Sequence, residues 1–281
     1  MYPSTDHGGA GRGDRLWTKT KGAPPLTGTL STLRAKLALS LLPRSPLPIT
    51  MRSFLLHQPL LFGLWFQMRR LRYTVFGARS DSIDQRPGAA ARFTVEKALP
   101  YNREMMWAIR RGRTERLMNI LRSINGLDTR QARLLCIGPR NEAEVLLLTL
   151  HGFRRRNIVA IDLFSYTPLI RVMDMHKLEF YDDSFDIVYS SYVVTYSSEV
   201  ERACAEALRV CRDGGLMVFA FERLRPGQGN LFGANPLEDG TPQLLSWFEP
   251  HVDHVYWREE FEHAPGRFMC SVIFRVKKPA G

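Results

Sequence analysis

The sequence predicts an α/β fold: a doubly wound, mainly parallel sheet of seven strands, with helices on both faces and an antiparallel edge strand at the C-terminus. Two observations predict it. After Gly126, short apolar runs typical of buried strands alternate with helix-length segments, which is the rhythm of parallel strands joined by right-handed crossovers. Near the end, strand-like segments at 252–257 and 268–276 follow each other closely, as an antiparallel pair does.

The individual elements of this half can be placed from the apolar pattern. Strands are expected at 134–137, 157–161, 171–173, 185–189 and 216–221, before the C-terminal pair. Helices are expected at 142–151 and 199–211, and the turn at 212–215 (Arg-Asp-Gly-Gly) separates the second helix from the fifth strand. A further helix at 103–124 precedes the first strand, because its apolar residues recur near a 3.6-residue period.

The composition is that of an ordinary globular protein, but the charge is unevenly distributed. Of 281 residues, 44% are hydrophobic and 24% charged, with a formal net charge of +11. Residues 1–125 hold 21 Lys and Arg against 7 Asp and Glu, whereas residues 126–281 hold 18 against 21. A basic half suits an anionic membrane surface, an import machinery, nucleic acid, or merely a solvated surface. Nucleic acid is disfavoured, because RNA-binding motifs and zinc-finger spacings are absent from the sequence.

The chain divides into three parts. Residues 1–50 are rich in Gly, Ser, Thr and Pro, and we expect a disordered or targeting extension. Residues 51–101 form a basic and apolar lid or membrane-interface segment, and residues 102–281 form the α/β domain with its leading helix. The expected location is the cytoplasm, with peripheral membrane association; the alternative is an organelle, after removal of the basic N-terminal segment.

A run of uncharged residues at 53–68 is followed by three arginines within four positions. The run is too short and too broken to span a bilayer, which takes about 20 apolar residues. Two interpretations stand side by side. Residues 52–72 lie in an anionic membrane interface with Trp65 and Phe66 at headgroup depth, or they form a helix that packs on the α/β domain as a lid.

The four cysteines show neither a CxxC pair nor the spacing of metal ligands. Two of them, Cys204 and Cys211, lie seven residues apart on a predicted helix, and Cys136 lies in an apolar strand-like run. We interpret all four as buried small apolar residues in a reducing compartment, and we expect no metal site.

Four motifs occur together in the order and spacing of a known family. They are LLCIGPRNEAE at 134–144, IVAIDL at 158–163, MDMHKLEFYDDSFDIVYSSYVV at 173–194 and EALRVCRDGGLMVF at 206–219. With these motifs, residues 134–278 resemble the class I S-adenosylmethionine-dependent methyltransferases, specifically the methyltransferase type 11 domain. The resemblance implies a Rossmann-like fold.

The resemblance also implies that S-adenosyl-L-methionine is the cofactor, and it predicts the residues that bind it. These are Gly138, Pro139, Glu142, Asp162, Leu163, Asp174, Met175 and Ser190. Asp162 would accept two hydrogen bonds from the ribose diol, since a carboxylate is a pure acceptor. Asp174 would receive the adenine amino group. The structural alternatives are a helix N-cap for Asp162 and a turn residue for Asp174.

The predicted cofactor loop departs from the family pattern. A usual loop has an acid two residues before its first glycine and further glycines at two-residue spacing. Here those places hold Cys136, Arg140 and Glu142, so only Gly138 remains. Our hypothesis is that Glu142 or the nearby Glu144 replaces the missing acid and faces the cofactor's ammonium group.

Methyl transfer from a sulfonium is an in-line displacement that depends mainly on positioning. The candidate catalytic groups are Tyr192 and Tyr196, which would position a hydroxyl nucleophile, and His176 as a base, although an exposed non-catalytic role is the favoured interpretation of His176. The predicted function is methyl transfer to a small-molecule or lipid-linked acceptor. The alternative is a noncatalytic protein of the same fold that serves as a binding or interaction module.

Overall fold

A computed structural model of the protein describes residues 54, 58–75, 81–82, 100–101, 104, 108, 111–197, 199–227 and 237–279. The predicted extension at 1–50 lies outside these residues, as does most of 103–110, the first part of the predicted leading helix. The rest of that helix is α5 (Arg111–Leu121). The α/β half of the chain, where the predicted site lies, is therefore described almost throughout.

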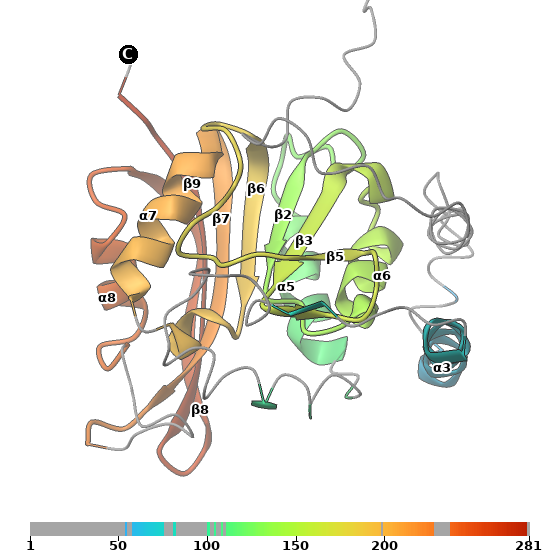
Figure 1. Ribbon diagram of the computed structural model, residues 1–281. Helices are drawn as coiled ribbons and strands as arrows, with labels where there is room; N and C mark the ends of the chain where they lie inside the picture. Colours follow the sequence, from blue (N-terminus) through green and yellow to red (C-terminus); the bar gives the residue numbers. More distant parts are fainter. Residues whose placement is uncertain are drawn as a thin grey trace, which may run out of the picture.

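The centre of the fold is one sheet with the strand order β5-β3-β2-β6-β7-β9-β8 (Figure 1). Its strands are β2 (Leu134–Ile137), β3 (Ile158–Asp162), β5 (Ile170–Val172), β6 (Phe185–Ser191), β7 (Cys211–Leu224), β8 (Val252–Ala264) and β9 (Arg267–Val276). The strand order reverses at β2, which lies between β3 and β6. Ligands of open α/β sheets bind beyond the carboxyl ends of the strands at such a switch point.

The direction of the strands confirms the predicted fold class. Strands β5, β3, β2, β6 and β7 pair in parallel, and β9 pairs antiparallel with both β7 and β8. The antiparallel strand β9 thus lies one position in from the edge that β8 forms. Strand β7 is longer than the predicted 216–221. It begins at Cys211, paired with Phe185 of β6, so the turn predicted at 212–215 lies within the strand, and it continues through Leu224 in register with β9.

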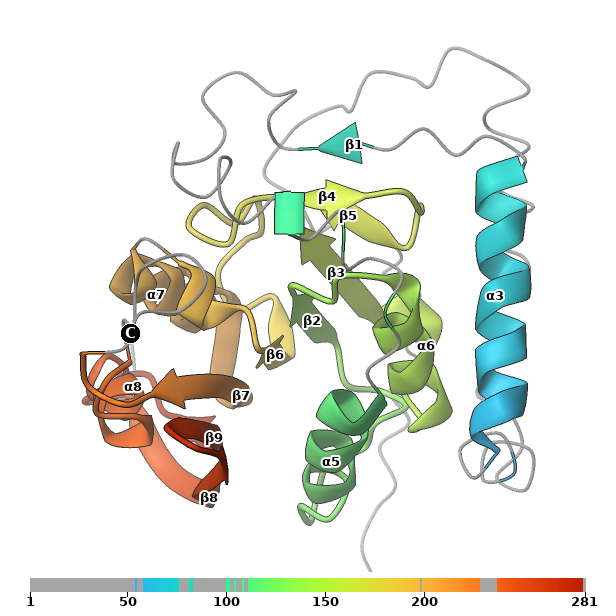
Figure 2. The same cartoon turned by 90° about the horizontal axis from the view of Figure 1, so that it is seen from below.

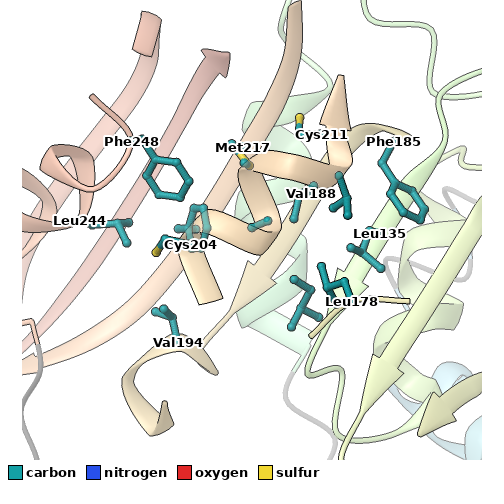
Figure 3. Packing of buried hydrophobic residues seen from close by; sticks show 14 of the residues in the cluster. Leu135, Leu178, Phe185, Val188, Val194, Cys204, Cys211, Met217, Leu244 and Phe248 are labelled. Atoms are coloured by element: carbon teal, nitrogen blue, oxygen red, sulfur yellow. The ribbon is translucent and has the colours of Figure 1, made fainter. Parts of the chain in front are cut away.

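Helices cover both faces of the sheet, and β2 shows how alternate side chains serve the two layers. Leu135 and Ile137 belong to the core that includes α7 (Val200–Val210) and α8 (Thr241–Ser246). Leu134 and Cys136 belong to the opposite core, with α5 and α6 (Glu142–Leu150). Figure 3 shows the first core, where Val188 and Met217 on the sheet face Cys204 of α7. All four cysteines are free and buried.

A helix from the basic half, α3 (Pro59–Val75), lies beside α6 at the edge of the molecule (Figures 1 and 2). Its Phe62 and Phe66 are completely buried against Ala143, Leu146 and other apolar residues of α6. The expectation that Phe66 sits at membrane headgroup depth is therefore wrong, because packing on α6 removes this side chain from the surface. A short pair that the sequence did not indicate, β1 (Asp81–Ser82) with β4 (Phe164–Ser165), also joins the two halves.

The contact between α3 and α6 gives a stability prediction. Replacing Phe66 with Ala should lower the free energy of unfolding by about 3 kcal/mol, since it empties a completely buried site. Leu64→Ala on the same helix removes a side chain that is 60% exposed and should change it by less than about 0.5 kcal/mol. Urea unfolding followed by circular dichroism measures both values. Equal values for the two variants would show that α3 is not held by this contact.

Candidate cofactor and methyl-transfer site

The predicted loop leaves β2 through a turn at Gly138 that requires glycine. Gly138 has φ +71°, and its N–H donates to the carbonyl of Ile161 on β3 at 2.8 Å. A Cβ added here would lie 2.5 Å from Cγ2 of Val193, in the segment after β6. The left-handed backbone conformation and the nearness of Val193 both exclude a side chain at position 138. The segments that follow β2 and β6 therefore come together at Gly138.

Asp162 ends β3 beside this turn, and it is buried. Its Oδ1 accepts a hydrogen bond from the Leu163 N–H at 2.6 Å, and its Oδ2 accepts one from the Arg140 N–H at 3.1 Å. Burial raises the pKa of the Asp162 carboxyl to about 6, against the lowering effect of these backbone donors. The carboxylate thus ties the loop after β2 to the end of β3.

The remainder of the loop is packed rather than open to solvent. Pro139 and Arg140 are buried, and Arg140 has φ +46°. The Arg140 guanidinium carbon lies 5.7 Å from the ring centroid of Tyr101, which in turn lies 6.1 Å from the ring centroid of Tyr196. Asn141 then caps α6, since its side-chain oxygen accepts from the Ala143 N–H at 3.0 Å. A residue ahead of α5 therefore lies close to the loop.

Glu142 is the first residue of α6 and is completely buried. Its carboxylate accepts a hydrogen bond from the hydroxyl of Tyr166. Glu144, also in the first turn of α6, is half-buried. An acid at a helix N-terminus is favoured by the helix dipole, so this position suits a carboxylate whether or not it also meets a cofactor.

Asp174 follows β5 at the neighbouring strand end and belongs to a buried chain of three side chains. Its Oδ1 lies 2.6 Å from Nδ1 of His176 and accepts from the His176 N–H at 2.9 Å. Nε2 of His176 lies 2.6 Å from Oγ of Ser197. Although desolvation opposes it, hydrogen bonding from His176 holds the pKa of Asp174 below its usual value. Met175, between them, is half-buried and packs on the core.

The three candidate catalytic side chains lie in different surroundings. His176 is buried, so its expected exposure is wrong: both its ring nitrogens are engaged by Asp174 and Ser197. Tyr192 is turned to the other core, where its hydroxyl lies 3.1 Å from Sδ of Met269. Only Tyr196 lies near the loop residues, through Tyr101.

Ser190, predicted to bind the cofactor, is buried in β6 opposite Ile137 of β2. The residues that sequence reasoning missed are Tyr101, Tyr166 and Ser197. Each of them meets its partner across at least 20 positions of the chain or across the boundary with the basic half, and no local pattern marks such contacts. Arg140 was noted only as a missing glycine, yet its backbone N–H holds Asp162.

The residues present fit S-adenosyl-L-methionine. An acid is buried at the end of β3, and its ionised carboxylate is a pure hydrogen-bond acceptor, as the ribose hydroxyls require. A second acid follows the adjacent strand β5, and the left-handed turn at Gly138 lies at the end of β2. Asp162, Asp174 and the Gly138 turn are the groups that would hold the ribose, the adenine and the methionine portion.

The strand order and the reversal at β2 are those of a Rossmann-like α/β domain, as the sequence predicted. Residues 135–219 match the family model described as a methyltransferase domain. The match covers the chain from β2 to β7, which contains Gly138, Asp162 and Asp174. No curated protein sequence matches the chain significantly.

Several solved structures of low identity are similar to part of this chain. A putative S-adenosylmethionine-dependent methyltransferase from Listeria monocytogenes is 14% identical, covers 59% of this chain and 99% of its own, and gives a TM-score of 0.44. A putative sarcosine dimethylglycine methyltransferase from Galdieria sulphuraria is 12% identical, with 59% and 85% covered and a TM-score of 0.46. A 1,6-didemethyltoxoflavin-N1-methyltransferase from Burkholderia thailandensis is 13% identical, with 67% and 92% covered and a TM-score of 0.44.

The turn at Gly138 gives a prediction with a matched control. Gly126 also has positive φ, +83°, but a Cβ there would meet nothing within 4 Å. Gly126→Ala should therefore lower the unfolding free energy by about 1 kcal/mol, the cost of placing a side chain on a left-handed backbone. Gly138→Ala adds the clash with Val193 and should lower it by about 3 kcal/mol or more. Chemical unfolding measures both. Adding Val193→Ala to Gly138→Ala should restore part of the loss, and no restoration would contradict the assigned clash.

Proposed function

We propose that this protein is an S-adenosyl-L-methionine-dependent methyltransferase that acts on a small-molecule or lipid-linked acceptor. The observation that carries the proposal is the buried Asp162 carboxylate at the switch point of the sheet, next to the left-handed turn at Gly138. A buried acid with a raised pKa destabilises the fold at neutral pH, and such groups are concentrated at functional sites. The match of residues 135–219 to a methyltransferase domain supports the same conclusion.

The bound cofactor would supply a methyl group on a sulfonium, which an acceptor nucleophile takes in line with the departing sulfur. The chain's own part is to bind and orient. Asp162 accepts from the ribose hydroxyls, and Asp174, held in place by His176, accepts from the adenine amino group. Tyr196, beside Tyr101, is the candidate that would orient the acceptor. None of these roles requires a strong base.

A second candidate function is a noncatalytic methyltransferase-fold protein that serves as a binding or interaction module. The observation that favours it is the loop after β2, where Arg140 occupies a glycine position and its side chain is buried over Tyr101. Titration calorimetry with S-adenosyl-L-methionine separates the two candidates. Heat of binding together with a raised melting temperature supports the first, whereas neither at millimolar cofactor supports the second.

The pKa of Asp162 gives a pH dependence for cofactor binding. The ribose hydroxyls donate hydrogen bonds and so favour the charged carboxylate, which predominates above pH 6. The dissociation constant for S-adenosyl-L-methionine should therefore rise about tenfold as the pH falls from 7 to 5. Calorimetry at both pH values measures this.

Asp162→Asn is the control for that experiment. It cannot ionise, so its binding should be weaker at pH 7 and should lack the steep pH dependence. Equal affinity of the natural protein at pH 5 and 7 would contradict the role of Asp162. A pH dependence that persists in Asp162→Asn would assign the titration to another group.

A further inference from the structure

The helix α3 has two apolar faces, and among the described residues only one of these faces packs on the domain. Phe62 and Phe66 are completely buried against α6. On another face, Leu60, Leu64, Met68 and Leu71 are 87%, 60%, 63% and 62% exposed. Their spacing of four, four and three residues places them in one stripe along the helix. We call these four residues the outer stripe of α3.

A stripe of this kind is unusual on a soluble surface. Single exposed apolar residues are common, but a contiguous row of long aliphatic side chains marks an interaction surface. The outer stripe contains four of the nine large hydrophobic residues that are exposed in the described part of the chain, and Leu61 and Phe54 are also among the nine. Exposed apolar side chains are therefore concentrated on and just before α3.

The charge of the segment that contains the stripe indicates what the stripe meets. The helix contains Arg69, Arg70 and Arg72 and no acidic residue. From Arg15 to Ser80 the sequence holds eleven Lys or Arg and not one Asp or Glu. A row of aliphatic side chains in an acid-free, basic segment is the composition of helices that lie in the interface of an anionic bilayer. A protein partner would need an apolar groove rimmed with acids, whereas anionic lipid offers both features everywhere.

We propose that the outer stripe of α3 docks this protein on the surface of an anionic phospholipid membrane. The helix lies in the plane of the interface and does not cross it, and no helix in the described part of the chain is long and apolar enough to span a bilayer. Packing of Phe62 and Phe66 on α6 fixes the helix to the domain before it meets lipid. The surface is thus preformed, and docking requires no release of α3. This proposal does not depend on methyl transfer.

Co-sedimentation of the full-length protein with vesicles tests the proposal. Binding should be strong to vesicles of phosphatidylcholine with phosphatidylserine, weak to phosphatidylcholine alone, and reduced by salt. Leu64→Ser combined with Met68→Ser should lower the partition coefficient about tenfold or more, because two aliphatic side chains no longer enter the interface. Tyr181→Ser with Val255→Ser is the matched control, since both side chains are exposed on other elements, and it should bind like the natural protein.

A fluorescent label on the outer stripe distinguishes membrane docking from contact with another protein segment. All four natural cysteines are buried, so Leu64→Cys provides a selectively reactive thiol for an environment-sensitive dye. Membrane docking predicts a blue shift only when vesicles containing phosphatidylserine are added. A blue shift that grows with protein concentration would identify a second copy of this chain, and one present at all dilutions would identify a covering segment of the same chain. Either result, or vesicle binding unchanged by the Leu64 and Met68 double variant, would overturn the proposal.

Methyl-transfer assays and cofactor calorimetry on the same double variant keep this proposal separate from the proposed function. Cofactor affinity should be unchanged, because the substituted side chains are exposed on α3 and contact none of the loop residues described above. Loss of vesicle binding with intact cofactor binding supports docking alone. If the natural protein does not bind the cofactor, the proposed methyltransferase function is overturned, and the docking result is unaffected.

Discussion

The site end of the fold depends on keeping the Asp162 carboxylate buried between the ends of β2 and β3. The raised pKa means that the folded protein binds this proton more tightly than the unfolded chain does. Above pH 6 the charged group therefore lowers stability by an amount on the order of 3 kcal/mol, and this penalty is absent below pH 4. Backbone donors from Leu163, Arg140 and Phe164 limit the penalty. The Arg140 donor is available only because Gly138 turns the chain back over β3.

The loop after β2 leads directly into α6, a helix whose residues are nearly all buried. Val145 and Leu148 face the sheet, whereas Ala143, Leu146 and Leu147 face α3. A helix that is apolar on every side needs cover on every side, and α3 provides the outer cover. The basic half of the chain is thus part of the domain's structure, because it fixes the helix whose first turn carries the loop.

Sequence reasoning reached the parts of this structure that local pattern determines. The apolar runs predicted most strands of the sheet closely, although β7 begins earlier and β8 ends later than predicted. Chain order placed Asp162 and Asp174 at strand ends. It failed where distant segments meet: Ser197 reaches His176 across 21 positions, which reversed the expected exposure of that histidine. The two-residue pairing of β1 with β4 has no periodicity to detect. The unbroken apolar run at 145–148 in α6 was a usable signal for the packing of α3, since it required a second covering layer.

The two readings of residues 52–72, lid or membrane segment, are compatible once α3 is divided into faces. Packing needs the aromatic side chains Phe62 and Phe66, whose burial holds the helix on α6. That requirement leaves the outer stripe unexplained, because a helix that only covered α6 would be more soluble with polar residues there. Aliphatic residues on the outer face, in a segment without acids, are consistent with a second apolar environment. A lid that is fixed to the domain by one face can therefore also be the surface by which the domain meets lipid.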